Sequence, residues 1–355
     1  MGKHNFSAGP SILPREVFDG SSNAIIQYGE TGLSIIEMSH RSKEIGLIIE
    51  EAKSLAMDLL GLDGKEYEVL FLQGGASLQF LMVAYNLLEK KAGYLNTGSW
   101  SEKAIKEAKF IGEVVELSSS KDNGYKHIPK KFDIPDDIDY IHLTSNNTIY
   151  GTQYKVVPKA NVPIVVDSSS DIFSRVFDYS CYDLIYAGAQ KNIGPAGVTL
   201  VAVKKNILGK VSREIPSMLN YKIHIEKGSL FNTPPVFAIY ATLLNLRWIK
   251  KQSIKALYKT NAKKAALLYE EIDKNELFTG FAEFQDRSLM NVTFDLIDND
   301  LSKSFDMLLE KENISGVKGH RSIGGYRASL YNALPIESVK VLINCMQELN
   351  VKFNK

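Results

Sequence analysis

Short apolar runs alternate with longer segments in which every third or fourth residue is apolar through the first 270 residues. Apolar runs bounded by turn residues are typical of buried strands, and a 3.6-residue apolar period is typical of amphipathic helices. The runs predict strands at 67–72, 94–97, 113–117, 139–144, 163–167, 183–188 and 198–205, and the periodic segments predict helices at 42–60, 77–91, 99–110, 236–252 and 253–273. This alternation favours an α/β fold, in which helices sandwich a mostly parallel sheet.

The pattern changes at about residue 274. A strand at 291–296, a helix near 301–313, a strand at 326–332 and a closing helix from Pro335 predict a smaller α+β unit. Gly9-Pro10 and Pro14 rule out a regular helix over residues 1–15, which are predicted to form an extended arm. We therefore expect a large domain over 16–255, a small domain over 256–355, and an N-terminal arm that packs near the small domain.

Composition and charge narrow the range of functions. Of 355 residues, 45% are hydrophobic and 23% are charged, as in an ordinary globular protein, and 42 Lys and Arg balance 41 Asp and Glu. No basic field favours nucleic acid, and no apolar run approaches the length that spans a membrane. The two cysteines form neither a disulfide framework nor a metal-ligand spacing. We expect a cytoplasmic protein with no metal, no nucleic-acid partner and no membrane partner.

The candidate chemistry centres on Lys191, in the short turn between the strands predicted at 183–188 and 198–205. Lysine is seldom fully buried, and one held in a tight, partly dry turn has a depressed pKa and a nucleophilic amine. Such an amine suits Schiff-base chemistry. From this turn alone, however, a surface lysine beside Gly194, Pro195 and Gly197 is an equally good interpretation.

Other polar groups also fall at the carboxyl ends of predicted strands, where open α/β sheets bind ligands. Asp167 ends an apolar strand, and an aspartate held against a protonated pyridine nitrogen would keep that ring an electron acceptor. A lone aspartate is more often a turn or cap residue. Ala76-Ser77 opens a helix after a strand and so presents N–H groups to an anion. Thr148 completes this set, and Trp100 is interpreted either as a core anchor or as a platform for a flat ring.

Histidine and arginine recur in two short clusters, His40-Arg41 and His320-Arg321, and Arg327 follows the second. Arg327 lies in a predicted apolar strand, where an unpaired guanidinium would be costly and where its planar fork suits a bidentate carboxylate contact. Either pair alone is more simply solvated surface charge. Both pairs together with Arg327 favour a site for a phosphate dianion and a carboxylate.

With these residues assembled, the sequence resembles the phosphoserine aminotransferase family, pyridoxal-phosphate enzymes of the fold-type I aminotransferase class. Similar blocks run along nearly the whole chain in the family's order, namely NFSAGPSILP, MSHRSKE, QGGASLQF, TGSWSEKA, TSNNTIYGTQY, VDSSSDIFSR, YAGAQKNIGPAG, FNTPPVFAIY and HRSIGGYRASLYNAL. The resemblance implies a pyridoxal 5'-phosphate-dependent aminotransferase of serine biosynthesis. Its substrates would be L-glutamate and 3-phosphohydroxypyruvate, and its products O-phospho-L-serine and 2-oxoglutarate.

The resemblance also implies roles for individual residues. Lys191 would bind the cofactor covalently and later move a proton at the substrate Cα, Asp167 would pair with the pyridine nitrogen, Trp100 would stack on the ring, and Thr148 would hydrogen-bond near it. The cofactor phosphate would be bound by Ala76, Ser77 and Gln190 and, from the neighbouring subunit of a homodimer with shared active sites, by Asn232 and Thr233. The substrate α-carboxylate would be held by Arg327, and its second anionic group by His40, Arg41, His320 and Arg321.

Two residues depart from the pattern of some family members: Ser77 stands where they have arginine, and Ala8 where they have serine. The first departure removes a phosphate ligand and leaves the geometry of that pocket open. An aminotransferase of the alanine–glyoxylate type and a nucleotide-binding or regulatory α/β module remain alternatives. The two His-Arg pairs argue against the first, and the absence of a dinucleotide glycine fingerprint argues against the second. The phosphorylated hydroxythreonine of vitamin B6 synthesis remains open as a further substrate.

Overall fold

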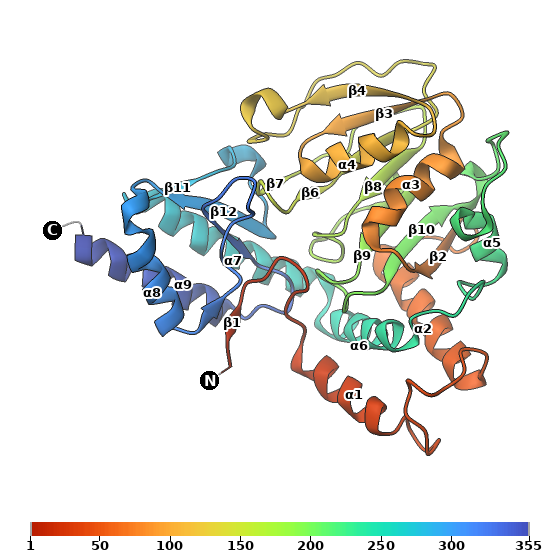
Figure 1. Cartoon of the computed structure of the whole chain (residues 1–355), viewed down its shortest axis with the longest axis horizontal. Coiled ribbons are helices and arrows are strands. Elements are labelled where there is room, and N and C mark those ends of the chain that lie inside the picture. Colours follow the sequence, from red (N-terminus) through yellow and green to blue (C-terminus); the bar gives the residue numbers. More distant parts are fainter. Residues whose placement is uncertain (1, 354–355) are drawn as a thin grey trace.

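Within residues 2–353, which the computed structural model describes, seven strands form the sheet at the centre of the larger part of the molecule (Figure 1). They lie in the order β2, β10, β9, β8, β5, β3, β4, and β10 alone among them runs antiparallel to its neighbours. Their bounds are β2 Tyr67–Leu72, β3 Lys91–Asn96, β4 Glu113–Ser119, β5 Ile141–Thr144, β8 Ile164–Asp167, β9 Leu184–Gly188 and β10 Thr199–Lys204. The predicted mostly parallel α/β sheet is confirmed.

Alternate side chains of each strand pack on opposite faces of this sheet. In β8, Ile164 and Val166 join the hydrophobic cluster that holds α2 and α6, whereas Val165 joins the cluster that holds α3 and α4. Because both faces are covered, the strands read as nearly continuous apolar runs. The helices of this part of the chain are α1 Arg15–Ile26, α2 Lys43–Leu60, α3 Gly75–Leu87, α4 Ser99–Ala108, α5 Tyr221–Glu226 and α6 Val236–Gln252.

A separate hydrophobic cluster is built from the later part of the chain. It surrounds an antiparallel sheet in the order β11, β12, β14, and it includes Phe6 of the N-terminal arm, where β1 pairs with β13. α7 contributes Leu257 to the cluster under the large sheet and Leu268 to this one, so it joins the two parts. The domain boundary at 255/256 stays a prediction. The remaining bounds are β1 His4–Asn5, β6 Asn146–Asn147, β7 Thr152–Gln153, α7 Ile254–Lys274, β11 Phe278–Gly280, β12 Asn291–Leu296, α8 Ser302–Lys311, β13 Ile314–Ser315, β14 Tyr326–Ser329 and α9 Ile336–Phe353.

Some predicted bounds were wrong. The helix predicted over 77–91 ends at Leu87, and Lys91 begins β3. The reason is a distant side chain: the carboxylate of Asp139 accepts hydrogen bonds from the backbone N–H groups of residues 89, 90 and 91 at 2.8, 2.6 and 2.9 Å. These bonds replace the helical ones. The pattern of the sequence did not predict α1, which begins at Arg15, the last residue of the predicted arm.

No helix within residues 2–353 is long and apolar enough to cross a membrane. The cytoplasmic location stays a prediction.

Candidate active site

Lys191 lies in the turn between β9 and β10, at the carboxyl edge of the parallel strands. Its Nζ donates to Oγ1 of Thr148 at 2.8 Å and lies 5.6 Å from the centroid of the Trp100 ring. Gly194 of this turn packs so closely against Thr242 of α6 that any side chain at position 194 would collide with it. Only glycine allows this approach, so the backbone that carries the lysine is fixed by packing.

Asp167 ends β8 and is buried. Its Oδ1 accepts hydrogen bonds from the backbone N–H of Ser169 at 3.0 Å and from the Ser169 hydroxyl at 2.6 Å. Ser169 Oγ in turn accepts from the N–H of Gly188, at the end of β9, at 3.1 Å. The carboxylate is therefore held in one orientation by two adjacent strands. Among residues 2–353, its hydrogen bonds are made through Oδ1, so Oδ2 can accept from a further donor.

Burial and charge shift both titrating groups of this edge. Burial raises the pKa of Asp167, although the positive charge of Lys191 opposes the shift. Burial lowers the pKa of Lys191 to about 8; Asp167 opposes this shift, while the charge of Arg327 adds to it. Lys191 therefore has more of the neutral, nucleophilic amine near neutral pH than an exposed lysine has.

The turn before α3 presents backbone donors to the same region. Gly74 and Gly75 have φ of 86° and 65°, a left-handed conformation that disfavours other residues, and α3 begins immediately at Gly75. The N–H groups of Ala76 and Ser77 belong to the first helical turn and have no helical acceptor. Together with the helix dipole they form a place where an anion binds well.

Arg327 reaches this region from the smaller sheet. It lies in β14, paired with Thr293 of β12, and its Nη1 donates to the carbonyl oxygen of Thr148 at 3.4 Å. Burial lowers its pKa from the usual arginine value. Among the described residues, its buried Nε has no hydrogen-bond partner. Such a guanidinium is an incomplete site for an anion, and a carboxylate would complete it.

These groups surround one cavity of about 270 Å³, called here the lysine cavity. Its lining is Ala8, Gly9, Gly75, Ala76, Ser77, Phe80, Trp100, Thr148, Ile149, Asp167, Ser169, Gln190, Lys191, His320 and Arg327. The cavity offers an amine, an oriented carboxylate, an aromatic face and bare amides at a helix N-terminus. These groups match the aldehyde, the ring nitrogen, the ring face and the phosphate of pyridoxal phosphate. The residues present therefore fit that cofactor.

Other predicted site residues lie outside the lysine cavity. His40 and Thr233 line a second, open hollow of about 520 Å³, called here the histidine hollow, together with Ile36 and Pro234. Its full lining is Ile35, Ile36, Met38, Ser39, His40, Ala196, Gly197, Thr233, Pro234, Pro235, Val236, Phe237 and Ala238. Arg41 and Arg321 are exposed.

Asn232 and Thr233 lie against Gln73, which directly precedes the glycine turn. The Gln73 Nε2 donates to the Thr233 carbonyl at 2.7 Å, and the Asn232 Nδ2 donates to the Gln73 Oε1 at 3.2 Å. Neither residue lines the lysine cavity of its own chain. The structure thus separates the predicted residues into a group inside the cavity and a group at a surface beside it.

Some residues that line the cavity were not predicted from the sequence. Ser169 orients Asp167, and a serine two positions after an aspartate is a turn signal that could have indicated it. Gly9 of the N-terminal arm touches the lysine turn, since a Cβ there would lie 3.4 Å from Cγ of Lys191. Nothing in the local pattern indicates that contact, because the arm and the turn are far apart in sequence.

Comparison with known proteins gives a consistent result. The family model described as aminotransferase class-V matches residues 3–342. A phosphoserine aminotransferase of Flavobacterium psychrophilum is 59% identical over 99% of this chain and 100% of its own. The solved phosphoserine aminotransferase of Bacillus circulans subsp. alkalophilus is 42% identical over 99% of both chains, with a TM-score of 0.95. The solved pyridoxal-phosphate-bound phosphoserine aminotransferase of Trichomonas vaginalis is 32% identical over 97% of this chain and 99% of its own, with a TM-score of 0.91.

Proposed function

The chain belongs to the class-V aminotransferases and, within them, to the phosphoserine aminotransferase family, and we propose from this premise which reaction it catalyses and which residues act in it. The reaction moves the amino group of L-glutamate to 3-phosphohydroxypyruvate and yields 2-oxoglutarate and O-phospho-L-serine. The observation that carries the proposal is the lysine cavity, where Lys191, Asp167 and Arg327 converge from two sheets. Both substrates carry an α-carboxylate and a second anionic group, so one set of cationic side chains serves both halves of the reaction.

Pyridoxal phosphate, when bound, supplies an electron-accepting ring that stabilises negative charge at the substrate Cα. Lys191 would attach it through Nζ and would then carry a proton to and from that Cα. Asp167, through Oδ2, would accept a hydrogen bond from the pyridine nitrogen and keep it protonated. Trp100 would stack on the ring, and Thr148 would hydrogen-bond beside it. The backbone N–H groups of Ala76 and Ser77, assisted by Gln190, would bind the phosphate.

Arg327 would bind the α-carboxylate of each substrate. It lies at the cavity wall with an unpaired Nε, and its guanidinium already contacts the carbonyl of Thr148, the residue that also contacts Lys191. A carboxylate bound there would lie beside the reacting amine. His320, in the same lining, and the adjacent Arg321 would contribute to the pocket for the second anionic group.

The predicted residues that lie outside the lysine cavity support a homodimer by their position on the surface. The histidine hollow is open, and Ile36 in its lining has an exposed fraction of 65%. Phe18, Ile26 and Leu33, which precede Ile36 in the sequence, are also exposed, with fractions of 51, 78 and 47%. A second copy would cover this surface. We infer that it would also bring His40, Arg41, Asn232 and Thr233 to the cavity of its neighbour, where they would bind the substrate's second anion and the cofactor phosphate.

Substrate comparison tests the proposed reaction. With L-glutamate as donor, kcat/KM for 3-phosphohydroxypyruvate should exceed that for hydroxypyruvate and for glyoxylate by at least about 10–100-fold, since a charge-assisted contact contributes about 1.5–3 kcal/mol. The measurement is the rate of 2-oxoglutarate formation with each acceptor. A preference for glyoxylate would instead support an enzyme of the alanine–glyoxylate type.

Hybrid dimers test the shared sites. A Lys191→Ala subunit and an Arg41→Ala subunit, each impaired alone, should regain activity when mixed, because one site then combines an intact Lys191 with the partner's intact Arg41. If Arg41 instead acted on the cavity of its own chain, no hybrid would hold an intact site and mixing would restore nothing. Two Lys191→Ala preparations mixed with each other serve as the control.

A further inference from the structure

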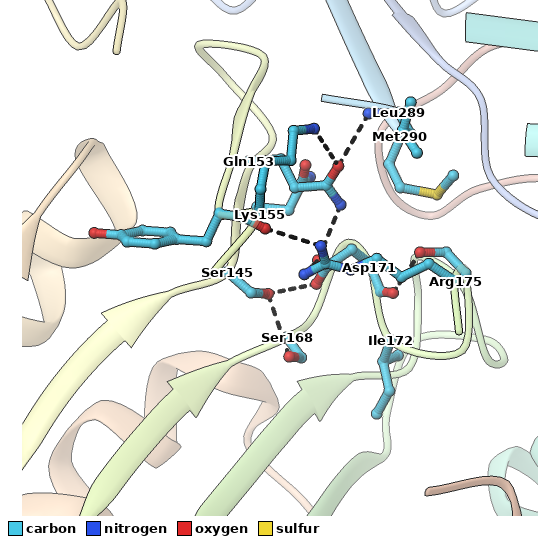
Figure 2. A network of polar contacts seen from close by, with 12 residues as sticks. Ser145, Gln153, Lys155, Ser168, Asp171, Ile172, Arg175, Leu289 and Met290 are labelled. Atoms are coloured by element: carbon cyan, nitrogen blue, oxygen red, sulfur yellow. Dashed lines mark hydrogen bonds and ion pairs between the residues drawn. The ribbon is translucent and has the colours of Figure 1, made fainter. Parts of the chain in front are cut away.

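A second buried carboxylate, Asp171, lies four residues beyond Asp167 and outside the lysine cavity. It occupies a polar network (Figure 2) between the end of β5, the turn after β8, and the residues just before β12 of the smaller sheet. Its Oδ1 accepts a hydrogen bond from the hydroxyl of Ser145, and its Oδ2 accepts from Gln153 Nε2 at 3.1 Å and from Arg175 Nη2 at 3.3 Å. The roles proposed above do not use this group.

The charge of Asp171 sets the direction of a short hydrogen-bond relay. A carboxylate only accepts, so the single hydrogen of the Ser145 hydroxyl points to Asp171. Ser145 Oγ then accepts from the hydroxyl of Ser168, 3.2 Å away, the residue that follows Asp167. The same Oγ lies 3.1 Å from the carbonyl oxygen of Asp167, and the Ser145 N–H donates to that oxygen at 3.0 Å. The relay therefore ties the start of the turn after β8 to the end of β5.

The other side of Asp171 is anchored to fixed backbone. Arg175 also donates through Nη1 to the carbonyl of Tyr154 at 2.9 Å, and Gln153 accepts through Oε1 from the N–H of Leu289 at 3.2 Å. Figure 2 shows Gln153 between Asp171 and Leu289, which lies just before β12. Through Gln153 of β7, these contacts connect the turn after β8 to the segment just before β12 of the smaller sheet. A buried carboxylate with several donors is held in one place, which is what a positioning role requires.

We propose that Asp171 is a positioning residue for the cofactor: acting through the Ser145–Ser168 relay, it holds the turn at 167–172 so that the Asp167 carboxylate meets the pyridine nitrogen. Ser169 orients that carboxylate locally, and Asp171 fixes the backbone from which Asp167 and Ser169 both project. The inference rests on the proposed pairing of Asp167 with the ring nitrogen. It predicts that damage to the relay weakens the contact with that nitrogen specifically.

The test compares two ligands of the cofactor-free, full-length protein: pyridoxal phosphate and its 1-deaza analogue, in which a carbon replaces the pyridine nitrogen. The ratio of their dissociation constants, followed by absorbance, measures the contribution of the nitrogen contact. The main variant is Ser145→Ala, because it removes the relay and leaves every charge in place. Asp171→Asn is only the second variant, because it removes a charge as well as the relay. Besides burial, that charge also acts to raise the pKa of Asp167.

Ser174→Ala is the matched control. Ser174 is a buried serine of the same segment, but its hydroxyl donates to the Asp171 backbone carbonyl, outside the relay. We expect Ser145→Ala to reduce the preference for pyridoxal phosphate over the analogue by about threefold to tenfold, the range for one hydrogen bond. Asp171→Asn should reduce it in the same direction, and Ser174→Ala should leave it at the wild-type value.

The outcomes separate the competing accounts. If Ser145→Ala keeps the wild-type ratio of dissociation constants, the proposal is wrong. In that case, an equal loss of affinity for both ligands would mean that the relay has only a structural role. If the wild-type protein itself binds both ligands equally, the pairing of Asp167 with the nitrogen fails, and the inference fails with it. Thermal unfolding of each cofactor-free variant shows whether it is folded, and Ser145→Ala decides the question should Asp171→Asn fail to fold.

Discussion

The lysine cavity and the histidine hollow lie in one molecule but are built in different ways. The cavity lies where parallel strands end; Asp167 is buried there and held by hydrogen bonds across two strands, and Lys191 and Arg327 are partly buried. The hollow is an open surface formed by loops and by the start of α6, with exposed apolar residues such as Ile36 beside His40. We expect from this difference that one chain carries the machinery for bond chemistry, and that a second copy adds residues that bind the substrate's second anion.

Removal of the reactive amine should have the largest effect. Lys191→Ala should lower kcat by at least about 10²–10⁴-fold, the range for loss of a positioned acid–base group, while the fold is retained. Transamination from glutamate is measured in steady state, and circular dichroism reports the fold. Substantial residual turnover in a preparation free of wild-type protein would remove Lys191 from the centre of the cavity.

Loss of the α-carboxylate contact should come next. Arg327→Ala should lower kcat/KM by about 10–100-fold for glutamate and for phosphoserine alike, because both substrates present the same carboxylate and a charge-assisted contact contributes about 1.5–3 kcal/mol. Arg327→Lys keeps the charge without the planar fork and should recover only part of this loss. An effect on one substrate only would place Arg327 at the second anion instead.

A change at Arg41, which follows His40 of the histidine hollow in the sequence, should affect substrates unequally. Arg41→Ala should raise KM for phosphorylated substrates by more than about tenfold, or about 1.4 kcal/mol, with little change in kcat for an acceptor that lacks the phosphate. Arg15→Ala is the matched control, since Arg15 is also exposed and its ion pair with Asp19 lies on α1. Unchanged specificity in the Arg41 variant would show that the phosphate pocket lies elsewhere.

The smallest effect concerns stability and pH. Burial lowers the pKa of Lys191 from 10.5 to about 8, so the unfolded chain binds more protons than the folded chain between those values. The free energy of unfolding of the cofactor-free protein should therefore rise with pH across this window, relative to Lys191→Met, and the difference should be constant below it. Denaturant unfolding of both proteins at several pH values measures this. A pH-independent difference would mean that the amine is not desolvated.

The cavity was more predictable from the sequence than the hollow, for a physical reason. Strand ends follow from apolar runs, and polar residues at those ends meet at one edge of a parallel sheet, so Lys191, Asp167 and Thr148 could be placed together. His40 and Thr233 lie on irregular segments whose position depends on contacts distant in sequence, and their predicted roles depend on a second chain. The end of α3 was also predicted wrongly, because it is set by the side chain of Asp139, which is distant in sequence.

The most direct test of the account is the visible absorption spectrum of the purified protein, recorded alone, with O-phosphoserine and with unphosphorylated serine. The account predicts a yellow band from pyridoxal phosphate bound to Lys191, and bleaching of that band by the phosphorylated amino acid but not by serine. Equal bleaching by both would contradict the assignment of the phosphate pocket. A protein that acquires no band when pyridoxal phosphate is added would contradict the account of the lysine cavity itself.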